Sequence, residues 1–304
     1  MKTKAIIRII AYCVVILVLV SILGGVLAFR LFSVDHRVDS WVAPILVPGS
    51  GEELVGTYIA EGKTATHIDI EWAAGSILIQ TGDVDQIQFS ESGEYEESEA
   101  LVYRQDGSKL AIRYQKEDVC FGFQSTHSKD LTITVPRNWE GLSIDIDAAS
   151  AQVELRGLTV REVDFDSASG TCVFTGCMVE ELNVSTASGD VEFTGFLGTL
   201  EMESMSAVFR GQFLSCPKSL EIDSMSGDME ITLPSNCGFT AQVDALSGNF
   251  DSNFHVNQRD DRYIHGDGNC RIFLSGMSGD IFIAQGDDIC HGESACHNPN
   301  GHHE

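Results

Sequence analysis

The chain has 304 residues and a formal net charge of −26, from 45 acidic and 19 basic side chains. This excess of negative charge repels nucleic-acid phosphates, so it argues against DNA or RNA binding and favours basic or cationic partners. The 29 glycines against 6 prolines are typical of many short strands joined by tight turns.

The first element is an apolar segment at residues 9–29, which carries no charged side chain. As a helix it would be roughly 30 Å long, the thickness of the hydrocarbon core, and it predicts one transmembrane helix. Lys2, Lys4 and Arg8 precede it, which favours a cytoplasmic N-terminus and predicts that the rest of the chain lies on the other side of the cell membrane. The alternative is a cleaved signal peptide, although the segment is longer than such peptides use and ends without an A-x-A site.

The other segments differ in composition. We expect a short cytoplasmic segment at residues 1–8, a juxtamembrane stalk at 30–56, a β-repeat domain at 57–285 and a Cys/His-rich tail at 286–304. Within the β-repeat domain, residues 57–136 alternate less regularly than residues 137–285, although residues 68–79 resemble a degenerate copy of the repeat. Because terminal repeats are commonly atypical, we expect the first part to cap the second.

A repeat marked by Ser-Gly or Ser-Ala dominates residues 137–285. The marker serines are Ser150, Ser169, Ser188, Ser206, Ser226, Ser247 and Ser278, at spacings of 19, 19, 18, 20, 21 and 31 residues. Six and four positions before each serine the side chain is apolar, and the position between them is polar or acidic in all copies but the last. This period of two predicts a strand with one buried face.

One repeat cannot bury its apolar face alone, whereas stacked repeats can. Two strands and a tight corner in each repeat predict an all-β fold, a parallel β-solenoid-like stack preceded by the one transmembrane α-helix. The alternative is a β-sandwich of successive antiparallel hairpins, in which Ser-Gly would close each hairpin. The regular spacing and the matching columns favour the stack.

Three motifs resemble a known bacterial family. They are Leu131-Thr-Ile-Thr-Val-Pro136, the turn Thr186-Ala-Ser-Gly-Asp-Val191 and the closing Met277-Ser-Gly-Asp-Ile281. Together they are similar to the β-strand-repeat domain of unknown function whose members are commonly described as adhesins. The resemblance implies a protein of the bacterial envelope, often behind a membrane anchor, and it implies no catalytic residues.

An acidic column precedes the marker serines and is the first candidate binding site. Three positions before the serines lie Asp147, Asp166, Ser185, Glu203, Asp223 and Asp244, and two positions earlier lie Asp145, Asp164, Asn183, Glu201, Glu221 and Gln242. If the repeats stack in register, these side chains recur about every 4.8 Å, which raises carboxylate pKa values or recruits a cation such as Ca²⁺. The alternative is a solvated polar face whose charge prevents aggregation.

The second candidate is the insert at residues 253–268, which lengthens the last spacing. It carries Arg259, Arg262, Tyr263 and His265. Long polar loops on rigid scaffolds are a common place for binding residues, so we assign these four to a candidate ligand site. The alternative is a tolerated insertion without a function.

Cysteines supply two further predictions. Cys216 and Cys237 each lie ten residues before a marker serine. If repeats adjacent in sequence are adjacent in the stack, their Cα atoms lie near about 4.8 Å, within the range of a disulfide. The eight cysteines outside the apolar segment permit other pairings, because their number alone does not fix the connectivity.

The tail offers a candidate metal site. Cys290, His291, Cys296 and His297 are soft ligands that suit Zn²⁺, although their spacing matches no standard zinc motif. The alternative is a flexible tail with a disulfide between its two cysteines. Apart from Ca²⁺ or Zn²⁺, the sequence suggests no cofactor.

The chain carries no G-x-S-x-G, H-E-x-x-H, P-loop or dinucleotide-binding signature. We therefore expect a non-catalytic, membrane-anchored envelope protein whose ectodomain acts as an adhesin or scaffold for a cell-wall polymer, a glycan or a protein. The alternative is a sensor or accessory subunit of an envelope-stress system. A polysaccharide-acting enzyme is a third reading, weakened by the scarcity of basic residues beside the carboxylates.

Overall fold

The structure is a computed structural model that describes residues 46–48, 54–60, 65–115, 128–259 and 261–286. The expected cytoplasmic segment, transmembrane helix and most of the stalk lie outside these residues, as does the tail from residue 287. In the part of the chain that the structure describes, no helix is long and apolar enough to cross a bilayer.

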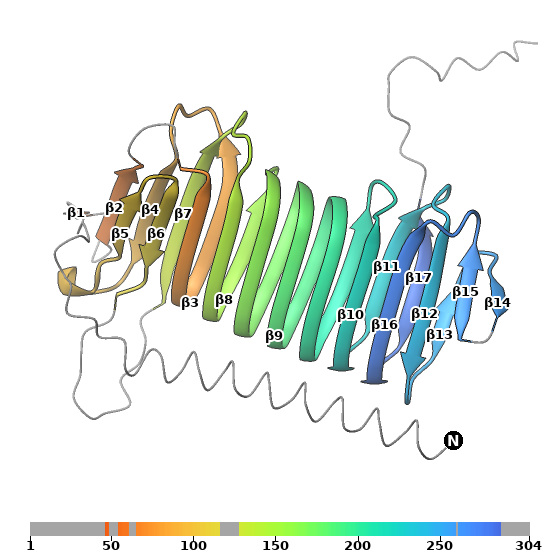
Figure 1. Cartoon of the computed structure of the whole chain (residues 1–304). Helices are drawn as coiled ribbons and strands as arrows, with labels where there is room; N and C mark the ends of the chain where they lie inside the picture. The colour runs from red at the N-terminus through yellow and green to blue at the C-terminus, as the bar shows by residue number, and fades with distance from the viewer. Residues whose placement is uncertain (1–45, 49–53, 61–64, 116–127, 260, 287–304) are drawn as a thin grey trace, which may run out of the picture.

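The described residues form 17 strands, all hydrogen-bonded into one continuous sheet that coils along an axis (Figure 1). The N-terminal strands are β1 (Leu46–Pro48), β2 (Leu54–Ile59), β3 (His67–Gly82), β4 (Gln88–Gly93), β5 (Val102–Asp106), β6 (Lys109–Arg113) and β7 (Lys129–Pro136), with a 3-10 turn at Glu97–Glu99. The central strands are β8 (Ser143–Arg156), β9 (Thr159–Phe213), β10 (Ser219–Ser226) and β11 (Met229–Pro234). The C-terminal strands are β12 (Phe239–Ala245), β13 (Phe250–Ser252), β14 (Asn257–Arg259), β15 (Arg262–His265), β16 (Cys270–Ser278) and β17 (Ile281–Gly286).

The repeats stack in parallel and in register. β8 pairs with β9 from Ser143↔Glu162 to Arg156↔Thr175, on both sides of the Ser-Gly corner. β9 runs for 55 residues through three further corners without leaving the sheet, and β10 pairs with its last coil in the same parallel manner. The predicted β-solenoid-like fold is therefore confirmed, and the sandwich of antiparallel hairpins is wrong for the repeats.

The corners form one column, and close approach explains their glycines. Gly189 has a φ of 128°, and a Cβ atom on it would lie 1.8 Å from the carbonyl oxygen of Gly170 in the neighbouring coil. A Cβ atom on Gly170 would in turn lie 2.2 Å from the carbonyl oxygen of Ala151. Glycine serves here both because it tolerates a positive φ and because the next backbone occupies the space of a side chain.

The small polar residues two positions before the marker serines complete each corner. Three of their hydroxyl groups donate to the carbonyl oxygen two residues later, at 3.0–3.1 Å: Ser167 to Ser169, Thr186 to Ser188 and Ser224 to Ser226. These bonds satisfy carbonyl groups that the bend removes from the regular ladder. This explains why only small residues, often with a hydroxyl, occupy the column.

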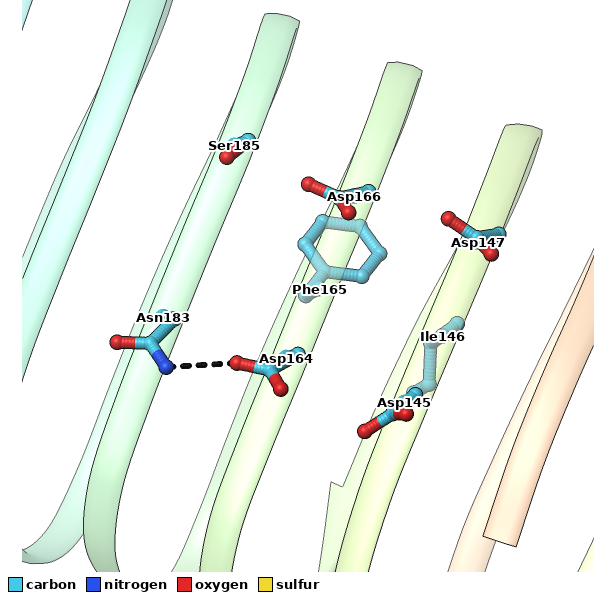
Figure 2. A pocket seen from close by; sticks show the side chains of 8 residues that line it. All are labelled: Asp145, Ile146, Asp147, Asp164, Phe165, Asp166, Asn183 and Ser185. Carbon is cyan, nitrogen blue, oxygen red and sulfur yellow. Dashed lines mark hydrogen bonds between the residues drawn. The ribbon is translucent and has the colours of Figure 1, made fainter. Parts of the chain in front are cut away.

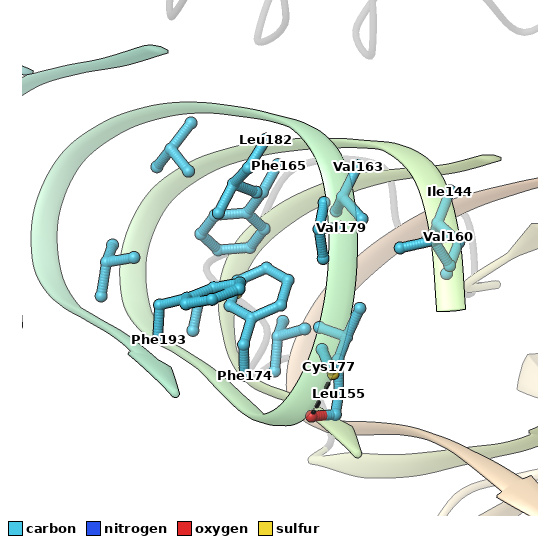
Figure 3. Close-up of a cluster of buried hydrophobic side chains, with 14 of the residues drawn as sticks. Ile144, Leu155, Val160, Val163, Phe165, Phe174, Cys177, Val179, Leu182 and Phe193 are labelled. Carbon is cyan, nitrogen blue, oxygen red and sulfur yellow. Dashed lines mark hydrogen bonds between the residues drawn. The ribbon is translucent and has the colours of Figure 1, made fainter. Parts of the chain in front are cut away.

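The apolar columns meet inside the coils and form one continuous core (Figure 3). Phe174, Phe193 and Phe213 follow one another along the axis, with ring centroids 5.4 and 5.7 Å apart. Each of these side chains is at most 3% exposed. Burial of each such ring contributes about 1.5–3 kcal/mol, so packing between neighbouring coils stabilises the stack.

The order of the coils differs from the order of the sequence at the N-terminal end. β3 pairs in parallel with β8 on one side and with β6 and β7 on the other. Residues 67–82 are therefore an internal coil of the stack, so regular stacking begins well before residue 137. Antiparallel pairs of β2 with β4, β4 with β7 and β5 with β6 cover the outer edge.

The same departure occurs at the C-terminal end. β16 lies between β10 and β12, and β17 lies between β11 and β13 (Figure 1). The last repeat is thus inserted between the two repeats that precede it in sequence. The insert at residues 253–268 brings the chain back, and its strands β15 and β14 add to the open edge of β12 in antiparallel fashion. This return path accounts for the 31-residue spacing.

A buried ion pair lies inside the N-terminal end. The Nζ of Lys129 lies 2.7 Å from Glu91 Oε1, and the two side chains are 1% and 0% exposed. Nζ also donates to the carbonyl oxygen of Glu99 at 2.6 Å and lies 4.0 Å from the ring centroid of Tyr114. Burial lowers the pKa of Lys129, and the Glu91 carboxylate opposes that effect.

Candidate functional site

Two ladders of carboxylates run along one side of the stack, which we call the acidic face. It consists of the outward side chains of the strands that precede the Ser-Gly corner. The register places the following acids side by side on neighbouring strands: Asp145 and Asp164, Asp147 and Asp166, Glu201 and Glu221, and Glu203 and Asp223. Of the five acids predicted as a column, the structure thus places Asp147 beside Asp166 and Glu203 beside Asp223, with Ser185 between the two pairs. The fifth, Asp244, lies beyond Ser275 of the inserted coil.

The middle of the acidic face is hollowed into a shallow groove of about 330 Å³. Figure 2 shows its polar lining as two rows on successive strands: Asp145, Asp164 and Asn183 in one, and Asp147, Asp166 and Ser185 in the other. Asn183 Nδ2 donates to Asp164 Oδ1 at 2.6 Å. Asn183 and Ser185 thus separate the aspartates from the next acids along the stack and supply neutral hydrogen-bonding groups.

Burial, together with the crowding of carboxylates, raises the pKa values of Asp166 and Glu203. Burial raises the pKa of Asp166, and the neighbouring Asp164 raises it further, although Ser185 opposes this through a hydrogen bond. Burial likewise raises the pKa of Glu203, with additional repulsion from other acids, Asp223, Glu201 and Glu221. These two carboxyl groups therefore hold protons more tightly than isolated carboxyl groups do, and a nearby cation would relieve the same repulsion.

Basic side chains gather at the N-terminal end of the acidic face. The ladders continue there as Asp69 and Glu71 on β3, and Lys109 Nζ lies 2.5 Å from Asp69 while Arg113 Nε lies 3.1 Å from Glu71. Burial disfavours the charge on Asp69, but hydrogen bonds from Arg113 and Lys109 outweigh it and lower the pKa of Asp69. The ladder thus changes from cross-linked ion pairs at this end to a row of acids beyond it.

A Ser–His–Asp row lies between these two regions. His67 Nδ1 is 3.0 Å from Ser143 Oγ, and His67 Nε2 is 3.1 Å from Asp145. These residue types also build hydrolase triads, but Ser143 is only 7% exposed, and its Oγ lies 3.4 Å from the carbonyl oxygen of Thr66 as well. The row orients His67 toward Asp145 and presents no accessible nucleophile.

The strands that follow the corner form a second outward surface, which we call the mixed face. Here arginines stand among the acids: Arg156 pairs with Glu154, and Arg210 Nη1 lies 3.3 Å from Glu192 and 3.8 Å from Asp190. Opposite charges on neighbouring positions cancel much of the field at this surface. The acidic face is consequently the side that presents charge of one sign over several coils.

The four candidate residues of the insert divide into two pairs. The Tyr263 ring lies 4.1 Å from Phe250, and the His265 ring lies 4.8 Å from Phe254, centroid to centroid, so both rings pack on the end of the stack. Arg259 and Arg262 oppose each other across β14 and β15 and are exposed. Tyr263 and His265 therefore pack on the core, and of the four residues only the two arginines are exposed; ligand binding by them stays a prediction.

Cys216 and Cys237 are joined by a disulfide, with Cα atoms 5.2 Å apart. The predicted pairing is confirmed, but the expectation that these two repeats lie next to each other in the stack is wrong. The inserted coil that begins at Cys270 separates their strands. The tail ligands Cys290, His291, Cys296 and His297 lie outside the residues that the structure describes.

The sequence analysis did not predict the ion pairs at the N-terminal end of the acidic face. Asp69 and Glu71 lie in residues 68–79, whose alternation matches the later repeats, so aligning that segment with them would have found both acids. Lys109 and Arg113 alternate on β6, but no repeat marker indicates that β6 packs beside β3. The ion pairs between β6 and β3 depend on the order of the coils in the stack, and local sequence patterns do not reveal that order.

Several solved structures are similar to this chain. A putative adhesin from Bacteroides fragilis aligns with a TM-score of 0.49 and 14% sequence identity, covering 78% of this chain and 98% of the other. A putative cell adhesion protein from Clostridium sporogenes gives 0.40 and 10%, covering 76% and 99%. A putative lipid binding protein from Parabacteroides distasonis gives 0.38 and 14%, covering 79% and 98%.

No curated protein matches the chain. The family described as Toastrack DUF4097 matches residues 65–284, which extend from just before β3 into β17. This match includes every coil of the stack, both acidic ladders and the insert. The chain therefore belongs to the Toastrack DUF4097 family.

Proposed function

We propose that the protein is a non-catalytic, membrane-tethered component of the bacterial envelope whose acidic face binds a basic partner, in the manner of an adhesin or scaffold. The observation that carries the proposal is the pair of in-register carboxylate ladders on one side of a rigid stack. The apolar segment at residues 9–29 supports the tether, because its length and flanking charges suit a single span.

The ladder geometry suits electrostatic recognition. Acids on neighbouring strands lie about 4.8 Å apart, well inside the screening length of about 8 Å at physiological salt, so their potentials add. A field of one sign accelerates encounter with a basic partner and repels acidic competitors. Because the coils are held by backbone ladders and a packed core, the charges keep their positions, and little ordering entropy is lost on binding.

The test compares binding by two variants that change the same net charge on different faces. Asp164→Asn, Glu201→Gln and Glu221→Gln remove three charges from the acidic face, and Glu154→Gln, Glu192→Gln and Glu230→Gln remove three from the mixed face. We expect the full chain in detergent micelles to bind immobilised poly-lysine. The acidic-face variant should bind roughly tenfold more weakly, if each lost contact is worth about 0.5 kcal/mol.

The mixed-face variant should lose less than about threefold in affinity for poly-lysine. Added salt should weaken poly-lysine binding by the unmodified chain more than binding by the acidic-face variant. Purified cell-wall polymer should then be tested in the same assay, to ask whether a natural envelope polymer uses the same surface. Equal losses in the two variants would mean that total charge, rather than the ladder, governs binding, and the acidic face would lose its assignment.

A further inference from the structure

Three cysteine sulfur atoms meet near the C-terminal end of the stack. Cys216 precedes β10, Cys237 precedes β12 and Cys270 opens the inserted strand β16. Their Sγ atoms all lie within 4.8 Å of one another. Cys216 and Cys237 form the disulfide, and Cys270 remains a thiol beside it. Neither the ladders nor the proposed binding function uses this cluster.

Backbone contacts hold the three segments together apart from the disulfide. The N–H of Cys270 donates to the carbonyl oxygen of Gly238 at 3.0 Å, and the N–H of Arg271 donates to that of Lys218 at 3.2 Å. Gly238 has no room for a side chain, because a Cβ atom there would lie 2.0 Å from Asp267 Oδ1. The inserted coil is therefore fixed between its neighbours at the level of the cysteines.

The arrangement fits the coordination sphere of a thiophilic metal. Zinc–sulfur bonds are about 2.3 Å long, so three sulfurs around a tetrahedral ion lie about 3.8 Å apart. The cluster already holds the sulfurs within 4.8 Å, and the Cα atoms of the bonded pair are 5.2 Å apart. Once the disulfide opens, rotation of the side chains brings all three sulfurs to the required separation without moving the coils.

We propose that Cys216, Cys237 and Cys270 form a binding site for one soft metal cation of the zinc class when the disulfide is reduced. A dithiol reductant supplies the two electrons: its own sulfurs become a disulfide, its two protons pass to Cys216 and Cys237, and their bond breaks. The cation then replaces one proton on each of the three thiols, and three thiolate–metal bonds form. Three protein ligands leave a fourth position for solvent.

The exposure of the three residues sets the order of events. Cys216 is exposed, so a reductant reaches the disulfide from its side, whereas Cys237 and Cys270 are each 1% exposed. Burial also shields the Cys270 thiol from reagents in solvent while the disulfide is intact. The disulfide and the metal are alternative links between the same segments, so the end of the stack stays closed in both redox states.

The experiment uses the full chain with Cys120, Cys290 and Cys296 replaced by serine, which removes every cysteine outside the described residues except Cys13 of the apolar segment. After reduction with a phosphine, Cd²⁺ is added as a spectroscopic substitute for Zn²⁺. We expect one Cd²⁺ per chain and an ultraviolet thiolate-to-cadmium band, and neither in the oxidised protein. Cys270→Ser should weaken Cd²⁺ binding more than about 100-fold, since it removes a direct ligand, while the buried core variant Cys172→Ser should bind normally.

A second measurement needs no cluster variant. Bound Cd²⁺ should protect Cys216, Cys237 and Cys270 together from alkylation, as read by mass spectrometry of their peptides, with circular dichroism confirming that the reduced protein is folded. The proposal is overturned if the reduced, folded chain binds no Cd²⁺. It is equally overturned if Cys270→Ser keeps the band, or if Cd²⁺ leaves the three thiols open to alkylation.

Discussion

At the scale of single residues, two kinds of position carry constraints beyond hydrophobic patterning. The corner glycines have no space for a side chain, because the carbonyl group of the next coil lies where a Cβ atom would be. The pair of Glu91 and Lys129 is fully buried, and each partner depends on the other's charge. Both kinds can be tested by substitutions that leave the apolar core unchanged.

Gly189→Ala should destabilise the protein by about 3 kcal/mol or more, since it combines a positive φ with a clash against the neighbouring backbone. Gly176 is a matched control, because its φ is also positive, at 62°, but nothing lies within 4 Å of an added Cβ atom. Gly176→Ala should cost only about 1–2 kcal/mol. Chemical denaturation followed by circular dichroism measures both, and equal costs would contradict the close-approach explanation.

Glu91→Gln should cost about 3–5 kcal/mol, because it leaves the buried ammonium group of Lys129 without its carboxylate. The double variant with Lys129→Met removes both charges and should recover much of the loss. Asp83→Asn is the exposed control: its partner Arg137 is 64% exposed, and breaking that pair should cost less than about 1 kcal/mol. A double variant no more stable than Glu91→Gln would show that the ion pair is not the source of the effect.

At the scale of strands, the sequence was a good guide to local structure and a poor guide to neighbours. Alternation and the Ser-Gly corners predicted the strands, their buried faces and the acidic column, because each depends on residues close in sequence. The coil order was not predictable in this way, since every repeat carries the same columns and fits beside any other. Only the 31-residue spacing before Ser278 hinted that the last coil is inserted.

The acidic face also makes stability depend on pH. Burial and neighbouring acids raise the pKa values of Asp166 and Glu203, so the folded state binds these protons more tightly than the unfolded state. The stability that these two groups contribute appears as the pH falls through their raised pKa values in the folded state. It is fully present below their pKa values in the unfolded state, which are near 4. Asp69 has a lowered pKa, so its contribution is lost only at still lower pH.

Protonation of Asp166 and Glu203 should therefore raise the melting temperature as the pH is lowered from 7 to about 4.5. The variant with Asp166→Asn and Glu203→Gln should show a smaller rise, because it has no carboxylates to protonate at those two positions. The variant with Glu154→Gln and Glu230→Gln on the mixed face is the control and should keep the rise of the unmodified chain. If the melting temperature of the acidic-face variant depends on pH as it does in the unmodified chain, Asp166 and Glu203 are not the cause of that dependence.

At the scale of the whole molecule, the stack behaves as a one-dimensional array whose middle and ends follow different rules. Along β9, between β8 and β10, each coil contacts the coils before and after it in sequence, so stability there is close to a sum over neighbouring pairs. At both ends an inserted coil links segments that are distant in sequence. A coil should therefore be removable from the middle of the array.

Deleting residues 173–191 removes one repeat of 19 residues and joins Cys172 directly to Glu192. The inward–outward alternation is preserved across the junction, because Cys172 and Val191 occupy the same position in successive repeats. We expect a folded protein that is shorter by about one strand spacing, 4.8 Å, measurable by small-angle X-ray scattering. Deleting residues 173–190 instead leaves one extra residue and turns the following strand over, so apolar side chains face solvent. That protein should unfold or aggregate; if both deletions fold equally well, neighbouring coils are not locked by the register of their side chains.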